Sequence, residues 1–205
     1  MAIISAGCRD SVQQRLWRGR SIHLSPEHVN TTAPRGANED NPMNKKCICI
    51  FDLDGTLSDG THRLHLLPKK DLHLTESWSE FNGASIGDSP IQSTIDVANA
   101  LYRSGMTVII LTGRSDEVKT ETMIWLDRYG VKYDSLIMRR ASDNRKDTVI
   151  KEEELRKIGL DRIVAAWDDS PNVIAHLRGL GITTYQVCDY GENLHEHLKS
   201  HGVDK

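Results

Sequence analysis

Runs of apolar residues alternate along the chain with segments in which apolar residues recur every three or four positions. The apolar runs lie within residues 47–51, 106–114, 133–140, 162–170 and 182–187. Most of them are apolar at both odd and even positions, which is typical of strands buried on both faces in a parallel sheet. The segments between them, such as 90–103 and 116–129, have the spacing of amphipathic helices. This alternation predicts an α/β fold, a doubly wound parallel sheet with helices on both faces.

Residues 1–42 differ in composition from the rest of the chain. Up to Pro26 they contain four arginines and one acidic residue, and a polar run without periodicity follows. An organellar transit peptide has a composition of this kind. We favour a disordered tail, or a translation start that really lies at Met43, because composition alone is weak support for a transit peptide. We therefore predict one domain over residues 43–205.

Charge and composition exclude several classes of function. The net charge is −3, so the chain has no overall basic field that would attract nucleic acid. No run of about 18 apolar residues occurs, so neither a membrane span nor a membrane partner is predicted. The four cysteines lack zinc-binding spacing and are interpreted as reduced thiols, which predicts a cytoplasmic protein.

Polar side chains follow three of the predicted strands at the points where those strands end. They are Asp52, Asp54 and Thr56 after the first strand, Thr112 and Arg114 in the second, and Asp168 and Asp169 in the fourth. The carboxyl ends of parallel strands meet at one edge of the sheet, where α/β proteins bind ligands. Four clustered carboxylates require a divalent cation, and Mg²⁺ prefers a few carboxylates together with water and phosphate oxygens. Lys146 or Lys151 could add positive charge beside a bound phosphate.

The order of these motifs resembles that of the haloacid dehalogenase superfamily over about residues 45–191. The resemblance rests on the sequence DLDGT at 52–56, LTGR at 111–114, a lysine before the fourth strand, and the acidic pair at 168 and 169. Members of this superfamily are Rossmann-like, Mg²⁺-dependent phosphatases that act through an aspartyl-phosphate. The resemblance implies that Asp52 is the nucleophile and that Asp54 is the general acid and base.

The same resemblance implies roles for the other strand-end residues. The implied ligands of Mg²⁺ are Asp52, the backbone carbonyl of Asp54, and Asp168 or Asp169. Thr112 and Lys151 would hold the remaining phosphate oxygens. Large caps in this superfamily are inserted after the first motif or between the second and third motifs. Here those gaps hold only residues 58–90, with one short helix expected at 74–83, and residues 116–140, so a minimal cap and an open site are expected.

A closer resemblance is to the 3′-phosphatase domains of bacteriophage polynucleotide kinase/phosphatases. Those domains carry an arginine shortly after the first motif and another at the end of the second motif, matched here by Arg63 and Arg114. They also carry a stretch matched by RKDTVIK at 145–151, in which Asp147 and Lys151 are the functional pair. The resemblance implies a nucleic-acid repair enzyme that acts on phosphorylated ends, in the host cytoplasm if it is phage-encoded.

Several alternatives remain open at this stage. Lys146 lies beside the functional pair and Arg139 ends the third strand, so both are candidates for substrate binding. Arg63 and Arg114 could instead be solvated surface charges. The sequence contains no GxxxxGK[ST] phosphate loop, which puts a coupled kinase and phosphatase role in doubt. A phosphatase for mononucleotides or small metabolites and a non-catalytic phosphate-binding module are the competing functions, and the oligomeric state is undetermined.

Overall fold

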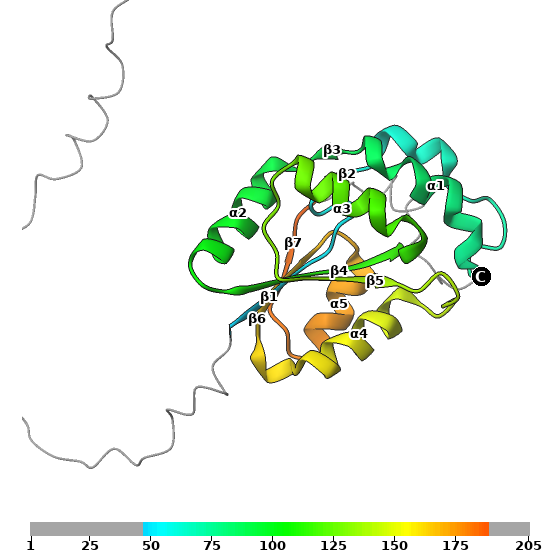
Figure 1. Ribbon diagram of the computed structural model, residues 1–205. Helices are drawn as coiled ribbons and strands as arrows, with labels where there is room; N and C mark the ends of the chain where they lie inside the picture. The colour runs from blue at the N-terminus through cyan, green and yellow to red at the C-terminus, as the bar shows by residue number, and fades with distance from the viewer. Residues whose placement is uncertain (1–46, 189–205) are drawn as a thin grey trace, which may run out of the picture. The chain divides into compact units, whose positions relative to one another are not determined.

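The computed structural model describes residues 47–188, and its centre is a parallel sheet with the strand order β5-β4-β1-β6-β7 (Figure 1). The strands are β1 (Ile48–Phe51), β4 (Thr107–Ser115), β5 (Ser135–Arg139), β6 (Ile163–Asp168) and β7 (Thr184–Gln186). All four pairings between them are parallel. The chain runs from β1 outward to β5 on one side and then crosses to β6 on the other side. The strand order therefore switches direction at β1, which is where such sheets bind their ligands.

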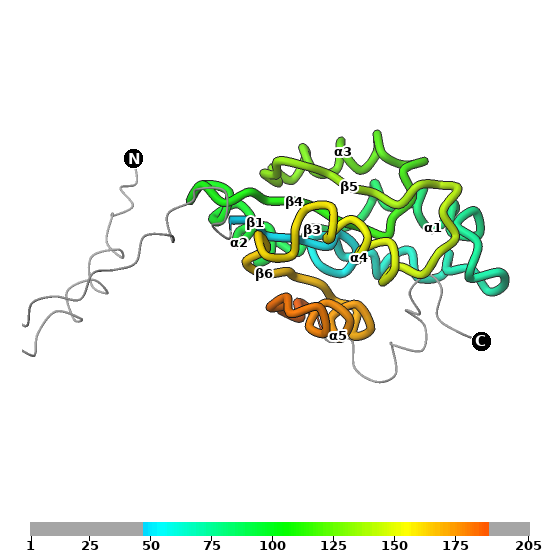
Figure 2. Tube along the Cα trace, turned by 90° about the horizontal axis from the view of Figure 1, so that it is seen from below, coloured from blue at the N-terminus to red at the C-terminus, as the bar shows by residue number. Residues whose placement is uncertain are grey.

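Helices cover both faces of this sheet. The longer ones are α2 (Gln92–Arg103), α3 (Lys119–Arg128), α4 (Asp147–Ile158) and α5 (Pro171–Gly179). The helices α2 and α3 lie on one face, and α4 and α5 lie on the other (Figures 1 and 2). The short 3₁₀ turns η6 (Asp116–Val118) and η7 (Leu160–Arg162) lie before α3 and after α4. The predicted doubly wound α/β fold is confirmed.

The central strand β1 supplies apolar side chains to both faces, as its continuous apolar sequence predicts. Cys49 and Phe51 pack in one buried cluster with residues of α2 and α3. Ile48 and Ile50 pack in a second cluster with residues of α4 and α5. Full burial of an aliphatic or aromatic side chain contributes about 1.5–3 kcal/mol, so these four positions anchor the strand firmly beneath the site.

A short insertion follows β1 and lies beyond the carboxyl edge of the sheet. It is framed by an antiparallel ribbon of β2 (Ser58–Asp59) and β3 (Ser89–Pro90). Between these strands lie the 3₁₀ turns η3 (Thr61–Leu66), η4 (Thr75–Trp78) and η5 (Ala84–Gly87) and the short helix α1 (Ser79–Gly83). Residues 60–88 are named the cap below. Where the sequence predicted one short helix over 74–83, the structure has η4 followed directly by α1.

The cap is tied to the loop before α4 by side-chain hydrogen bonds. The backbone N–H of Thr75 donates to Asn144 Oδ1 at 2.8 Å, and the Thr75 hydroxyl donates to the carbonyl of Asp143 at 2.7 Å.

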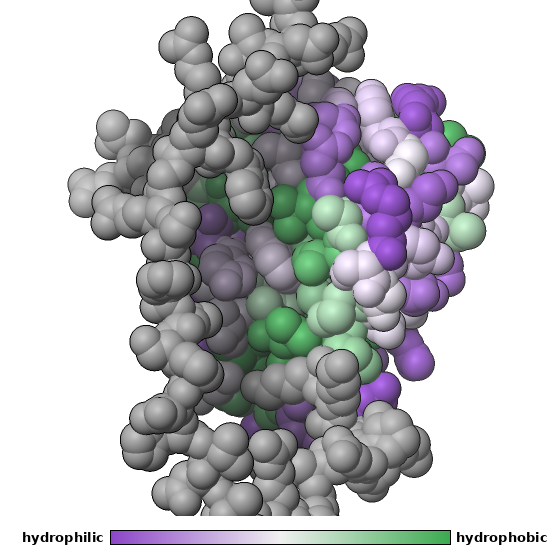
Figure 3. Space-filling view, turned by 90° about the vertical axis from the view of Figure 1, so that its left-hand side faces the viewer, coloured by the Kyte–Doolittle hydropathy of each residue, from purple (hydrophilic) through white to green (hydrophobic). Residues whose placement is uncertain are grey.

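The face opposite the cap, where the parallel strands begin, exposes hydrophobic side chains beside hydrophilic ones (Figure 3). Across residues 47–188, no helix is both long and apolar enough to cross a membrane. The predicted tail at 1–42 lies outside the described residues.

Candidate active site

One pocket opens at the sheet edge where β1, β4 and β6 end. Its polar lining includes Asp52, Asp54, Thr112, Arg114, Asp147, Lys151, Asp168 and Asp169. The structure therefore brings together side chains that follow three separate strands, along with two from the start of α4. The cap forms the facing wall with Arg63 and with the apolar side chains of Leu64, Leu67, Trp78 and Phe81.

Lys151 lies at the centre of the first group of charged residues in this pocket. Its Nζ donates to Asp52 Oδ1 and to Asp168 Oδ2, both at 2.8 Å, and lies 3.3 Å from Asp147 Oδ2. Asp147 and Lys151 are one turn apart on α4, so both side chains point to the same side of that helix. All four side chains are buried. One ammonium group thus joins the predicted nucleophile to a predicted metal ligand.

The carboxylates around Lys151 outnumber its single positive charge. Burial raises the pKa of Asp52 well above its usual range, and Lys151 opposes that shift only in part. Burial also raises the pKa of Asp168, and burial together with the charge of Asp168 raises the pKa of Asp169 to about 7. Burial alone would lower the pKa of Lys151, but the surrounding carboxylates outweigh it and raise that pKa. The pocket floor therefore holds more carboxyl groups than the single charge of Lys151 can stabilise in ionised form.

This donor set fits a magnesium ion. Within residues 47–188, no three carboxylate, histidine or cysteine side chains converge as a ready-made metal cage. Mg²⁺ does not need one, because it is commonly bound through one or two carboxylates, phosphate oxygens of the substrate, and water. Asp52 and Asp168 share a hydrogen-bonding partner and are therefore close together. Burial raises the pKa of both carboxyl groups, and a divalent cation bound beside them would stabilise their ionised forms.

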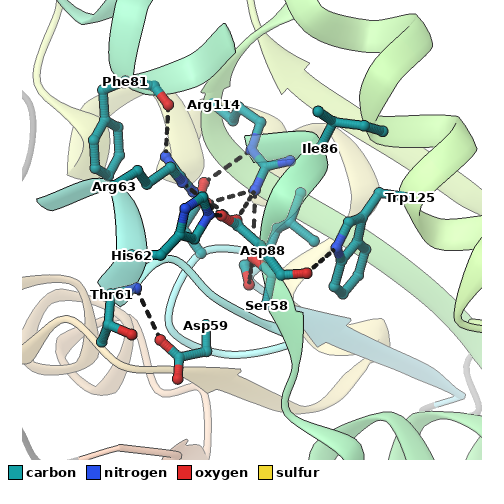
Figure 4. A network of polar contacts seen from close by, with 12 residues as sticks. Ser58, Asp59, Thr61, His62, Arg63, Phe81, Ile86, Asp88, Arg114 and Trp125 are labelled. Atoms are coloured by element: carbon teal, nitrogen blue, oxygen red, sulfur yellow. Dashed lines mark hydrogen bonds and ion pairs between the residues drawn. The ribbon is translucent and has the colours of Figure 1, made fainter. Parts of the chain in front are cut away.

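Asp54 belongs to a second cluster, which also contains Arg63 and Arg114 (Figure 4 shows the two arginines). Arg63 Nη2 and Arg114 Nη2 both donate to Asp54 Oδ1 at 2.5 Å, and Arg114 Nε donates to Oδ2 at 3.2 Å. Burial by itself would raise the pKa of Asp54, but Arg114 and Arg63 outweigh burial and hold that pKa well below its usual range. Asp54 is therefore a carboxylate at neutral pH in the absence of substrate.

Asp88, which the sequence pattern does not identify, completes this second cluster. Its side chain is fully buried and accepts hydrogen bonds from Arg63 Nε at 2.7 Å and Arg63 Nη2 at 2.8 Å. Arg114 Nη2 lies 3.3 Å from Asp88 Oδ2, and His62 Nε2 lies 3.0 Å from Asp88 Oδ1. Two arginines beside one carboxylate are a signal that a second acid is needed. The local pattern around position 88 does not identify which residue supplies it.

Arg63 and Arg114 are held inside this cluster and do not project from the pocket rim. Their exposed fractions are 0% and 2%, so the alternative that they are solvated surface charges is wrong. Both residues line the pocket, and their predicted contact with substrate stays a prediction.

The remaining substrate-binding candidates lie outside the pocket lining. Arg139 is fully buried and donates to three backbone carbonyls, that of Gly113 among them, and to Asp147 Oδ1 at 3.3 Å. This position makes Arg139 a support for Asp147 and the adjoining loop. Lys146 is exposed and precedes α4. Of the two lysines that the sequence left open, Lys151 is the one that lines the pocket.

The end of β4 supplies the hydroxyl group of Thr112, and at Gly113 its backbone lies close to the side chain of Asp147. Thr112 Oγ1 accepts a hydrogen bond from the backbone N–H of Arg114 at 3.1 Å, so its own O–H can donate into the pocket. A Cβ atom at Gly113 would lie 2.6 Å from Asp147 Oδ1, which is too close for any side chain. The glycine of the LTGR motif therefore leaves room for the Asp147 carboxylate in the position where it pairs with Lys151.

The cap contributes an apolar wall, defined here as Leu64, Leu67, Trp78 and Phe81. The rings of Trp78 and Phe81 meet edge to face, with centroids 5.9 Å apart. The guanidinium carbon of Arg63 lies 3.9 Å from the centroid of Phe81, so one face of that ring is occupied. Trp78 is 8% exposed, whereas the other three are half-buried and offer more surface to a ligand.

Comparison with known families and structures identifies relatives of this chain. The family model of the polynucleotide kinase PNKP phosphatase domain matches residues 46–192. No curated protein matches the chain. A hydrolase of the haloacid dehalogenase-like family from Streptococcus pneumoniae is 14% identical, with a TM-score of 0.50 over 74% of this chain and 90% of that one. That likeness shows the shared fold alone.

Two solved structures are more similar in sequence. One is the Pnkp1/Rnl/Hen1 RNA repair complex, in which the matched chain is 29% identical with a TM-score of 0.57. Another Pnkp1/Rnl/Hen1 complex gives 25% identity and a TM-score of 0.56. Each match covers 82% of this chain, but 50% and 57% of the respective relatives. The chain thus spans about half the length of these relatives.

Proposed function

The chain belongs to the family of polynucleotide kinase PNKP phosphatase domains, and we propose that it is a Mg²⁺-dependent phosphomonoesterase that removes 3′-phosphate groups from polynucleotide ends. Its membership places it among the haloacid dehalogenase-type phosphatases. The observation that carries the proposal is the pairing of Asp52, held by Lys151, with Asp54, held by two arginines, in one pocket with an apolar wall.

In the first step, the carboxylate of Asp52 attacks phosphorus, and the bond from phosphorus to the leaving oxygen breaks. This step forms an aspartyl-phosphate on Asp52 and releases the polynucleotide hydroxyl. Lys151 orients the nucleophile, and Thr112 can donate to a non-bridging phosphate oxygen. Uncatalysed hydrolysis of phosphate monoesters can require acceleration by up to about 10²¹-fold, so no single donor could supply the effect.

The leaving oxygen needs a proton, and the substrate can provide it. Asp54 is ionised in the described arrangement because Arg63 and Arg114 stabilise its charge. A phosphate monoester has a second pKa of about 6, so below that pH it carries a proton of its own. Asp54 can accept this proton and pass it to the leaving oxygen. The same carboxylate then removes a proton from the water that attacks the aspartyl-phosphate, which regenerates Asp52 and releases phosphate.

Mg²⁺ would be held by Asp52, by Asp168 or Asp169, and by the backbone carbonyl of Asp54, and it would neutralise charge between the nucleophile and the phosphate. This assignment accounts for the excess of carboxylates over cations on the pocket floor.

The cap supports a substrate that carries a nucleobase. A phosphate anchored near Lys151 places its organic group against the apolar wall of the cap. A sugar phosphate would bring hydroxyl groups against Leu64 and Leu67, which offer no side-chain hydrogen-bonding partner, and this desolvation is unfavourable. A base presents a flat apolar face instead. One of the two related structures is an RNA repair complex, which supports a nucleic-acid end as the substrate class.

The proposal is tested by phosphate release from matched substrates in Mg²⁺ and in EDTA. A DNA and an RNA oligonucleotide, each with either a 3′- or a 5′-phosphate, are compared with a nucleoside 3′-phosphate and glucose 6-phosphate, and Asp52→Asn serves as the blank for contaminating phosphatases. We expect the 3′-phosphorylated oligonucleotides to have the highest kcat/KM. Faster hydrolysis of glucose 6-phosphate, or full activity in EDTA, would refute the corresponding part of the proposal.

A phosphatase for mononucleotides is the second candidate. One observation favours it: the three cations that line the pocket, Arg63, Arg114 and Lys151, all pair with carboxylates. The pocket itself therefore offers little free positive charge to a second phosphate group. The substrate comparison separates the two candidates, because a mononucleotide enzyme would not distinguish a nucleoside 3′-phosphate from an oligonucleotide end.

A further inference from the structure

A second pocket lies on the cap beside the active-site pocket. Leu67 lines both, so the second pocket continues outward from the apolar wall. Its polar lining includes Lys69, Lys70, Ser77 and Glu80. The two lysines follow Pro68 in the segment between η3 and η4, and they are exposed. We refer to this second pocket as the lysine groove.

The lysine groove differs from the active site in whether its lysine side chains form ion pairs with carboxylates. Neither Lys69 nor Lys70 makes a hydrogen bond or an ion pair with any residue in the range 47–188. In contrast, Arg63, Arg114 and Lys151 each contact at least two carboxylates. A phosphate that approached the lysine groove would therefore not have to displace an existing ion pair.

We propose that the lysine groove binds the phosphodiester group immediately 5′ of the terminal nucleoside in a 3′-phosphorylated strand. This inference rests on the proposed function, because it assumes that the 3′-phosphate is bound near Lys151 and that the terminal base contacts the apolar wall. The strand then leaves the active-site pocket past Leu67, and the next charged group that it carries reaches Lys69 and Lys70. A mononucleotide lacks that group and cannot use the lysine groove.

Glu80 sets the charge balance of the lysine groove. It is exposed and lines the groove with the two lysines, so a bound phosphodiester would experience one opposing charge. Asp71 follows the lysines directly and is also exposed. Removal of the Glu80 charge should therefore have the opposite effect to removal of the lysines. Ser77 adds a hydroxyl group that can donate to a phosphate oxygen.

The test compares thymidine 3′-phosphate with a thymidine trinucleotide that carries a 3′-phosphate, using the full chain in Mg²⁺. For the double variant Lys69→Ala/Lys70→Ala, we expect kcat/KM for the trinucleotide to fall by roughly fivefold at about 0.1 M salt, as loss of one phosphate contact implies. The slope of log kcat/KM against log salt should become shallower by about 0.7. Glu80→Gln should raise kcat/KM for the trinucleotide, and neither variant should change hydrolysis of thymidine 3′-phosphate.

Lys132→Ala is the matched control, because it also removes an exposed lysine but lies before β5, at the opposite edge of the sheet. It should leave both substrates unaffected. If Lys69→Ala/Lys70→Ala leaves trinucleotide hydrolysis unchanged, or lowers hydrolysis of both substrates equally, the lysine groove is not a strand-binding site and the proposed function stands. If the wild-type protein hydrolyses neither these two substrates nor the corresponding uridine substrates, the proposed function fails and this inference fails with it.

Discussion

Asp88→Asn tests whether the buried cluster of two arginines and two carboxylates supports both stability and catalysis. In the wild-type protein, the charges of Arg63, Arg114, Asp54 and Asp88 sum to zero in a site where both arginines are almost fully buried. Asparagine has the same shape as aspartate but carries no charge, and its amide nitrogen is a donor that would face guanidinium donors. The substitution therefore leaves one uncompensated positive charge inside the protein.

The expected loss of stability in Asp88→Asn follows from the burial of the two arginines. Removal of one partner from a buried ion pair costs about 3–5 kcal/mol, because the remaining charge stays desolvated. In a domain of about 150 residues, each 1 kcal/mol lowers Tm by about 2–4 °C, so a decrease of at least about 6 °C is expected. We also expect kcat to fall at temperatures where the variant is folded, because both arginines would then share the single carboxylate of Asp54.

The assay measures thermal unfolding by circular dichroism. It also measures kcat at about 15 °C below the variant's Tm, where the variant is folded. The control is Asp96→Asn, an exposed residue of α2 that accepts one hydrogen bond from Gln92. Such a surface change should alter stability by no more than about 0.5 kcal/mol. If Asp88→Asn matches this control in Tm and retains full kcat, Asp88 does not balance the arginines and the interpretation of the cluster is wrong.

Four further outcomes are expected. Asp52→Asn should abolish turnover without changing Tm by more than a few degrees, and activity close to wild type would remove Asp52 from its role. In EDTA, stability should fall as pH rises through about 7, because Asp169, whose folded pKa is raised to that value, must then lose its proton; Mg²⁺ should therefore raise Tm more at pH 8 than at pH 5.5. Gly113→Ala should displace Asp147 and lower kcat by at least about tenfold, an effect of about 1.4 kcal/mol, and unchanged kcat would show that the 2.6 Å approach is not needed. Finally, kcat/KM for an oligonucleotide should fall as pH rises above about 6, while p-nitrophenyl phosphate, whose leaving group needs no proton, should show a flatter profile; identical profiles would refute proton delivery by way of Asp54.

The sequence predicted the fold and the composition of the pocket floor well, because both depend on short-range patterns. Continuous apolar runs identify buried parallel strands, and side chains that follow such strands must meet at one edge. Asp52, Asp168 and Lys151 are joined in the structure through contacts that the motif order implies. Helix geometry also decides which of Lys146 and Lys151 reaches the pocket. Of the two, Lys151 lies one turn beyond Asp147 on the same side of α4.

The cap could not be predicted in the same way. Residues 60–88 consist mostly of 3₁₀ turns, whose side-chain directions are not encoded by a regular period. The sequence therefore gave no reason to pair Asp88 with Arg63, 25 positions away, or to place Leu64 and Trp78 in the pocket. Burial of Arg139 could not be predicted from the sequence either, because its hydrogen-bond acceptors are mainly backbone carbonyls.

The position of Asp88 connects the cap to the chemistry. It ends the cap at β3, while Arg63 lies in η3 at the cap's beginning, and the two side chains bond inside the protein. Arg63 reaches from there to Asp54, the residue that the proposed mechanism uses twice for proton transfer. Any movement of the cap that separates Arg63 from Asp54 would remove one of the two cations that keep this carboxylate ionised. In the proposed mechanism, the cap therefore bounds the substrate and also sets the basicity of the group that accepts and returns the proton.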